Sequence, residues 1–205
     1  MKTFQVTGIG NAMVDVLSTV SEAFLAEHDV QKGIMQLIDA ERAVALYGSM
    51  GPATEVSGGS AANTIAGFGM LGGRTAYVGK VKDDQLGRIF AHDIRSLGVI
   101  FDTPMTDKHA DGDETGRCIV LVTPDGERSM STYLGVSAIL GPGDIDEQAI
   151  AASEWIYLEG YRFDGPDGKA AFHKAVAAAK AAGTKVALTV SDPFCIERHR
   201  EDMKA

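Results

Sequence analysis

Apolar segments of strand length alternate with amphipathic stretches of helical period along most of the chain. This alternation is typical of βαβ units. It predicts strands at 4–9, 34–38, 76–79, 155–158 and 185–190, and a strand that runs into the glycines at 58 and 59. The last two of the five runs are apolar on both faces, which predicts a parallel sheet covered by helices on both sides. We therefore expect an α/β fold.

Capping residues and glycines mark the ends of the predicted helices. Ser21 and Asp39 are typical N-caps, because their side-chain oxygens accept a hydrogen bond from the first turn. Gly98 and Gly183 each follow a helical pattern at the position where a left-handed residue ends a helix. The predicted helices span 21–28, 39–47, 60–71, 84–97, 145–152 and 168–182.

One stretch interrupts the alternation with two adjacent strand-like runs, 117–122 and 128–134. The residues between them, Thr-Pro-Asp-Gly-Glu, are typical of a hairpin turn. A hairpin in an α/β chain serves either as a flap that covers a ligand and excludes water, or as a packed edge of the sheet. Both interpretations remain open from the pattern.

Composition narrows the class of protein. With 205 residues, of which 45% are hydrophobic and 23% charged, the chain predicts one globular domain. No apolar run reaches the ~18 residues needed to span a bilayer, and the first residues lack the order of a secretion signal, so we expect a cytoplasmic protein without a membrane partner. Cys118 and Cys195 are far apart and predict free thiols rather than a disulfide or a metal site. The net charge of −9 is spread along the chain, and we expect no nucleic-acid partner.

The segment from Glu55 to Gly67 carries the most chemical information. Gly58 and Gly59 lead into a helix of small residues with Asn63 in its first turn. Glycines let a ligand approach the backbone, and the amide of Asn63 can donate to and accept from a hydroxyl. This arrangement indicates a site for a sugar edge; a tight turn followed by close helix packing is the alternative.

The other glycine-rich stretches of the chain do not match the common nucleotide-binding motifs. Gly8-Ile-Gly10 lacks the third glycine of a dinucleotide-binding motif, and no phosphate-binding P-loop occurs. Gly141-Pro-Gly-Asp144 resembles a glycine-rich anion site, but Asp144 is predicted to cap the helix 145–152.

The stretch Gly58-Gly-Ser-Ala-Ala-Asn63 resembles the first signature of ribokinase-like (pfkB-type) carbohydrate kinases. The resemblance implies that Gly58, Gly59 and Asn63 hold the hydroxyls of the acceptor sugar. Gly10-Asn11 followed by Asp15 is similar to the strand-end motif of the same family, in which the aspartate grips two hydroxyls, as an ionised carboxylate can.

Two further segments extend this resemblance. Residues 78–87 are similar to a family block, and for Asp83 and Asp84 the favoured alternative is a strand followed by one of them as a helix cap. Ile65, and Thr115-Gly-Arg-Cys118 at the start of the hairpin, resemble adenosine kinases. That likeness implies that Cys118 and Leu134 lie near the bound ribose; as an alternative, Cys118 is a small core residue.

The resemblance implies a three-layer α/β sandwich with a mainly parallel central sheet and a small β lid. Residues 1–205 are expected to be the N-terminal part of the kinase domain, with the lid from roughly 10–20 and 100–140 and the C-terminal part absent. We expect the first four strands to form one parallel-dominated sheet covered by helices, with Asp15, Gly58, Gly59 and Asn63 converging on one cleft at the strand carboxyl ends.

The function implied for the intact protein is ATP-dependent phosphorylation of the 5′-hydroxyl of adenosine or a related nucleoside, with Mg²⁺. No catalytic or metal-binding residue is assigned within the chain, because the family's base and magnesium motifs are expected beyond Ala205. The alternatives are a ribokinase- or fructokinase-like sugar kinase, and a nucleoside- or sugar-binding fragment without catalysis. A homodimer through the lid also remains open.

Overall fold

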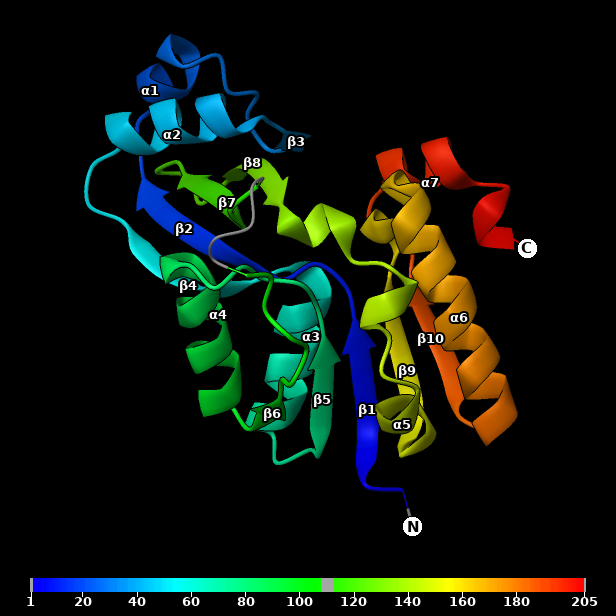
Figure 1. The fold of residues 1–205 in the computed structure, drawn as a ribbon. Helices are drawn as coiled ribbons and strands as arrows, with labels where there is room; N and C mark the ends of the chain where they lie inside the picture. Colours follow the sequence, from blue (N-terminus) through cyan, green and yellow to red (C-terminus); the bar gives the residue numbers. More distant parts are fainter. Residues whose placement is uncertain (1, 108–112, 205) are drawn as a thin grey trace.

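The computed structural model describes residues 2–107 and 113–204, in which the strands form two five-stranded sheets (Figure 1). The strands are β1 (Phe4–Ile9), β2 (Met13–Thr19), β3 (Met35–Leu37), β4 (Thr54–Gly58), β5 (Thr75–Val78), β6 (Val99–Ile100), β7 (Thr115–Val122), β8 (Arg128–Gly135), β9 (Ser153–Glu159) and β10 (Lys185–Thr189). The helices are α1 (Glu22–Glu27), α2 (Ala40–Ser49), α3 (Ser60–Met70), α4 (Gln85–Ser96), α5 (Glu147–Ala151), α6 (Pro166–Ala182) and α7 (Pro193–His199).

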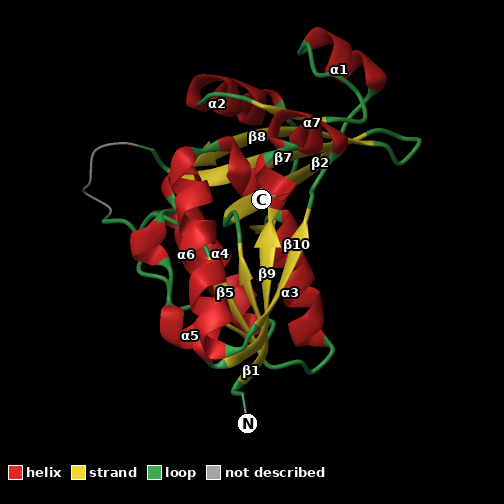
Figure 2. Cartoon of the chain, turned by 90° about the vertical axis from the view of Figure 1, so that its right-hand side faces the viewer, coloured by secondary structure: helices red, strands yellow, loops and turns green. Residues whose placement is uncertain are grey.

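The first sheet is parallel throughout, in the order β10-β9-β1-β5-β6. Helices cover both of its faces, with α3 on one side and α5 and α6 on the other (Figure 2). Consecutive residues of β5 show why: Tyr77 packs in a core with α3 and α4, whereas Val78 packs in a core with α5 and α6. The predicted α/β sandwich with a mainly parallel sheet is therefore confirmed.

The second sheet is mixed, in the order β3-β8-β7-β2-β4, and joins the first through the short link from β1 to β2. Alternate residues of β7 point to its two faces. Ile119 and Leu121 pack in a core with α1 and α2, whereas Cys118 and Val120 belong to a cluster on the other face. That other face lines a cavity.

The prediction that the first four strands share one parallel-dominated sheet is wrong. The segments predicted at 34–38 and before Gly58 form β3 and β4 of the second sheet, and β2 was not predicted as a strand. β3 pairs with β8 and β2 pairs with β7, and both partners lie far along the chain. Contacts between residues distant in sequence therefore determine these two pairings. The second sheet includes residues 13–19 and 115–135, inside the predicted lid ranges, and also β3 and β4, which lie outside them.

Most predicted helix ends are confirmed. Asp39 and Asp84 accept hydrogen bonds from the first turns of α2 and α4, and Gly183 ends α6 in the left-handed conformation. The prediction for Asp144 is wrong, because α5 begins two residues later and Asp146 caps it. Asp144 instead closes a tight turn, accepting from the Gly141 amide, and pairs with Lys80 at 2.7 Å.

The predicted hairpin is confirmed as β7 and β8, which pair antiparallel. Gly126 has a φ of +85° in the turn, and residues 124–127 form its exposed tip. Among the described residues, we find no helix long and apolar enough to cross a membrane.

Candidate functional site

A polar cluster forms where β2, β4 and α3 meet. The chain leaves β4 at Gly58 and enters α3 at Ser60, and Gly59 between them has a φ of +105°. A side chain at Gly59 would lie 2.4 Å from the carbonyl oxygen of Asn11, and one at Gly58 would lie 2.1 Å from the carboxylate of Asp15. The two glycines therefore let β2 and the start of α3 approach each other closely.

Asp15 and Asn63 lie side by side in this cluster. Both residues line the same cavity, and the Asn63 side chain is near enough to the Asp15 carboxylate to favour its ionised form. Burial raises the pKa of Asp15 to about 6, although the nearby Asn63 side chain and the positive charge of Arg128 act in the opposite direction. The structure thus brings the two predicted hydroxyl-binding side chains together, and their role as ligands of a sugar stays a prediction.

A buried carboxylate that the sequence analysis missed lies behind this cluster. Glu159, at the end of β9, accepts from the side-chain amide of Asn11 at 2.8 Å and from the backbone amide of Ala61, in the first turn of α3, at 3.0 Å. Burial raises its pKa. A charged residue directly after the apolar run 155–158 was the available signal, because ligands of parallel sheets bind at strand carboxyl ends.

The side chain of Asn11 is committed to this buried network. Its oxygen accepts from the Ser137 hydroxyl at 2.9 Å, while its amide nitrogen donates to Glu159. Arg162, in the turn that follows β9, extends this network by donating to the carbonyls of Ala138 and Leu140. Asn11 lines the cavity, but these contacts make it a support for the site as well as a predicted ligand.

A cavity of about 340 Å³ opens in front of the cluster and extends along the second sheet. Polar groups of its lining include Asp15, Asn63 and Glu159. The second sheet supplies most of the apolar lining, through Met13, Leu17, Met35, Leu37, Cys118, Val120, Met130 and Leu134, and Arg128 and Thr132 also line the cavity. Asp15 lies between Met13 and Leu17 on β2 and pairs with Cys118 on β7, so polar and apolar groups of the cavity are direct neighbours.

Cys118 and Leu134 both face this cavity, as predicted for the hairpin. The Cys118 thiol accepts from the Thr132 hydroxyl at 3.2 Å, and burial raises its pKa to about 12. A thiol with so high a pKa stays protonated near neutral pH, so Cys118 contributes a small apolar surface to the cavity rather than a nucleophile. Its contact with a ribose stays a prediction.

Tyr161 and Asp164 form the wall opposite the second sheet, and the sequence analysis did not single them out. The Tyr161 hydroxyl donates to Asp192, the N-cap of α7. Arg198 donates both of its bonds to the Asp164 carboxylate at 3.0 Å, which lowers the pKa of Asp164 despite its partial burial. These contacts hold the wall against α7.

Comparisons with known proteins agree with this geometry. A model of the pfkB family of carbohydrate kinases matches residues 35–204. The crystal structure of adenosine kinase from Sinorhizobium meliloti superimposes with a TM-score of 0.92 and 49% identity, over 98% of this chain and 61% of that one. A probable sugar kinase from Rhizobium etli CFN 42 superimposes with a TM-score of 0.93 and 45% identity, over 99% of this chain and 61% of that one.

Among curated sequences, fructokinase-2 of Solanum habrochaites is 29% identical over 190 residues, which is 92% of this chain and 49% of that protein. The chain therefore spans about half the length of the curated relatives it matches.

Proposed function

Since this chain belongs to the pfkB family of carbohydrate kinases, we propose that the protein containing it phosphorylates the 5′-hydroxyl of adenosine or a related ribose-bearing nucleoside, with ATP as donor. In this proposal residues 1–205 are the N-terminal part of the kinase domain. They carry the acceptor site, and the second sheet acts as its lid.

The mixed lining of the cavity is the observation that carries the nucleoside proposal. Asp15 and Asn63 offer acceptors and donors for ribose hydroxyls. Methionine, leucine and valine side chains of the second sheet, with Arg128 and Thr132 among them, make up most of the remaining wall, and its apolar side chains favour a flat apolar group over a hydroxyl-rich one. A purine base attached to the ribose would cover these apolar side chains, whereas a pentose or hexose would leave more of them exposed to water.

In the proposed mechanism the chain's residues bind and orient the acceptor. The ionised Asp15 carboxylate accepts two hydroxyl hydrogen bonds, and the nearby Asn63 side chain favours the ionised form of this carboxylate. Holding the acceptor in one orientation lowers the barrier to transfer, because phosphoryl transfer depends mainly on positioning and electrostatic stabilisation. Closure of the second sheet over the cavity would exclude water that competes with the acceptor.

No residue of this chain is assigned to ATP, Mg²⁺ or the catalytic base. Within residues 2–107 and 113–204, no group of three or more His, Cys, Asp or Glu side chains is arranged to hold a metal ion. ATP with Mg²⁺ is the donor expected for kinases of this family. We accordingly propose that the 205 residues alone bind acceptor weakly and do not transfer phosphate.

A sugar kinase is the second candidate, because the polar groups of the cavity suit any compound with neighbouring hydroxyls and a 45% identical relative is described as a probable sugar kinase. A coupled assay on the intact protein, with adenosine, ribose and fructose as acceptors, separates the two. We expect kcat/KM for adenosine to exceed that for either sugar by at least about 100-fold, equivalent to roughly 2.7 kcal/mol. Equal or higher values for a sugar would replace the proposal by the second candidate.

The same assay on the 205-residue chain tests the proposal that these residues alone do not transfer phosphate, and turnover comparable to that of the intact protein would contradict it. A homodimer through the lid stays a prediction, which sedimentation of the intact protein measures.

A further inference from the structure

The Asp84 carboxylate forms hydrogen bonds both with the first residue of the β7–β8 hairpin and with the N-terminus of α4. Asp84 caps α4 by accepting from the Gly87 amide at 2.8 Å through Oδ1. The same carboxylate accepts from the backbone amide of Thr115 through Oδ2 and from the Thr115 hydroxyl through Oδ1, both at 2.8 Å. Thr115 is the first residue of β7, so a helix cap and a strand start share one group.

This junction is buried and closely packed. Thr115 is fully buried, and its hydroxyl oxygen also accepts from the Lys82 amide at 2.9 Å. A side chain at Gly87 would lie 1.9 Å from the Lys82 carbonyl oxygen. The hydroxyl of Thr115 therefore joins β7 to the segment 82–84 that leads into α4, and no room is left for a side chain at Gly87.

Helix capping alone does not require these extra bonds. Asp39 and Asp146 cap α2 and α5 with bonds to the amides of their own helices. Asp84 makes the same kind of bond and adds two to a strand that begins 31 residues later. The additional bonds therefore act on the hairpin rather than on α4.

The hairpin supplies one wall of the acceptor cavity. Cys118 lies three residues after Thr115, and Leu134 precedes Gly135, which pairs with Thr115 across the ladder. A shift at Thr115 would carry both side chains with it, because paired strands move as a unit. The hydrogen bonds between Asp84 and Thr115 therefore lie next to the residues of the hairpin that face the cavity.

We propose that Asp84 and Thr115 are positioning residues for the acceptor site: their paired hydrogen bonds fix the root of the lid hairpin on α4 and so set the cavity wall that carries Cys118 and Leu134. The role of that wall in nucleoside binding rests on the function proposed above. The hydrogen bonds that fix the hairpin on α4 do not depend on that function.

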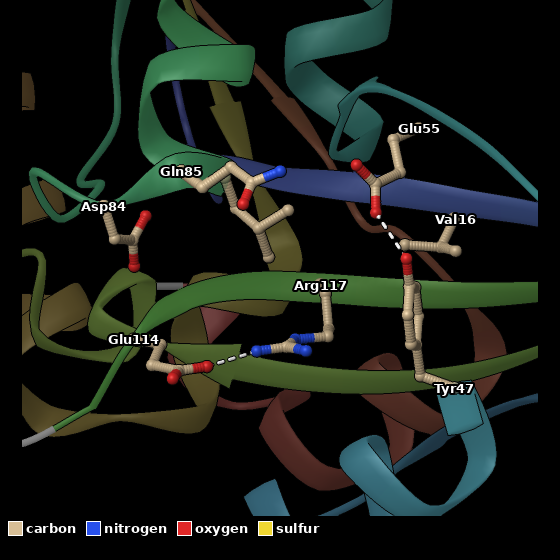
Figure 3. A pocket seen from close by; sticks show the side chains of 8 residues that line it. Val16, Tyr47, Glu55, Asp84, Gln85, Glu114 and Arg117 are labelled. Carbon is tan, nitrogen blue, oxygen red and sulfur yellow. Dashed lines mark hydrogen bonds and ion pairs between the residues drawn. The ribbon is translucent and has the colours of Figure 1, made fainter.

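The surroundings leave the hairpin room to move if the anchor is lost. Asp84 borders a cavity of about 270 Å³ behind the second sheet (Figure 3). Charged and polar groups on its walls pair with one another, Arg117 with Glu114 and the Tyr47 hydroxyl with Glu55. A cavity therefore adjoins Arg117 near the start of β7 on this side of the sheet, whereas Ile119 and Leu121 further along the strand pack in the core with α1 and α2.

The test uses Thr115→Val, which keeps the shape of the side chain and the Asp84 cap but removes the bridging hydroxyl. The readout is the rate at which a thiol reagent labels Cys118, followed by peptide mass spectrometry, with the fully buried Cys195 as internal reference. We expect Cys118 to be labelled roughly ten-fold faster, because local opening exposes the thiol and relieves the burial that raises its pKa. Thr115→Ser, which keeps the hydroxyl, should restore the slow rate.

The matched control is Thr184→Val. Thr184 is also buried, and its hydroxyl donates to the carbonyls of Ile150 and Ser153, both at 3.0 Å, in the part of the fold built on the first sheet. We expect this variant to lose stability without faster labelling of Cys118. Equal labelling of Cys118 in the two variants, or no acceleration in folded Thr115→Val, would overturn the proposal.

A second comparison addresses the carboxylate and the proposed function separately. We expect Asp84→Asn in the intact protein to raise KM for the acceptor about ten-fold with a smaller effect on kcat, and Asp146→Asn to leave both unchanged. If the wild-type protein does not phosphorylate a nucleoside, the proposed function fails, and the labelling result still decides the anchoring. If labelling accelerates in Thr115→Val but KM does not change in Asp84→Asn, the anchor does not position the acceptor site and the proposal is wrong.

Discussion

At the scale of single residues, the site contains a carboxylate whose surroundings oppose its ionisation. Asp15 is partly enclosed by β4, α3 and the second sheet, and burial raises its pKa to about 6 from an ordinary value of 3.8. The folded protein therefore holds the proton more tightly than the unfolded chain does. Between pH 3.8 and 6 this group makes the unliganded protein less stable as pH rises, because the folded state must give up that proton.

The first prediction concerns the pH dependence of acceptor binding. The ionised form of Asp15 is the form that accepts two hydroxyl hydrogen bonds, so protons compete with the acceptor. We expect adenosine affinity, measured by titration calorimetry on the intact protein, to be constant above pH 7 and to fall below about pH 6, by up to about ten-fold per pH unit.

Asp15→Asn provides the control for this prediction. We expect the variant to bind roughly 2 kcal/mol more weakly at pH 8, because a hydrogen bond to a charged group is lost, and to show no dependence on pH between 5 and 8. A pH profile that persists unchanged in Asp15→Asn would assign the titrating group to another residue.

The second prediction concerns Glu159, which joins three segments through hydrogen bonds that water cannot reach. We expect Glu159→Ala to lower the free energy of unfolding by about 3 kcal/mol in urea denaturation, because Asn11 and the first turn of α3 lose a buried charged partner. Glu154 lies on the same strand and is exposed. Glu154→Ala should change the free energy of unfolding by less than about 0.5 kcal/mol, and equal losses in the two variants would contradict the structural role of Glu159.

At the scale of secondary structure elements, the sequence predicted helix ends correctly where the residues that determine them are close in sequence. The ends of α2, α4 and α6 follow from Asp39, Asp84 and Gly183, because caps and left-handed glycines act within one turn. Asp144 shows the limit of this reasoning. Pro142 starts a separate turn there, so the cap of α5 moved two residues on to Asp146.

Strand partners could not be predicted in the same way. β3 is three residues long and half-exposed, and it pairs with β8 more than 90 residues later. The polarity pattern of such a strand states which face is buried but not which sheet it joins, because pairing depends on contacts distant in sequence. The candidate site residues Asp15 and Asn63 were nevertheless predicted, since their motifs are local. Glu159 had only a general signal in the sequence, a charged residue at the end of an apolar strand, and its partners became visible when β9 was seen beside β1.

The third prediction tests the turn of the lid hairpin. Gly126 has a φ of +85° with open space around the position of a side chain, so Gly126→Ala adds backbone strain without a clash. We expect a loss of about 1 kcal/mol in the free energy of unfolding. Gly143 also has open space and lacks the left-handed conformation, so Gly143→Ala should be neutral or slightly stabilising in the same thermal or urea measurement. Equal effects at the two positions would show that the turn conformation is not the determinant.

At the scale of the whole molecule, the candidate site belongs to neither sheet alone. Asn63 and Glu159 come from α3 and the end of β9, whereas Asp15 and most of the apolar lining come from the strands of the second sheet. Two of the covalent connections between these parts are short, namely residues 10–12 between β1 and β2 and Gly59 between β4 and α3. A ligand that contacts Asp15 and Asn63 would therefore restrain β2 relative to α3, and a ligand that also covers the apolar side chains of β7 and β8 would restrain the hairpin as well.

The last prediction uses this division to distinguish a nucleoside from a sugar. With adenosine at saturation, hydrogen exchange followed by mass spectrometry should slow in the first turn of α3, in β2, and in β7 and β8, whose residues Cys118, Val120 and Met130 form part of the apolar wall. With ribose at saturation, slowing should be confined to the first turn of α3 and to β2, because the sugar has no apolar group to order the hairpin. The exposed tip at 124–127 serves as an internal reference that should not change with either ligand. Equal protection of the hairpin by ribose and adenosine would mean that the apolar side chains of the hairpin do not hold the base, and it would remove the observation that favours a nucleoside over a sugar.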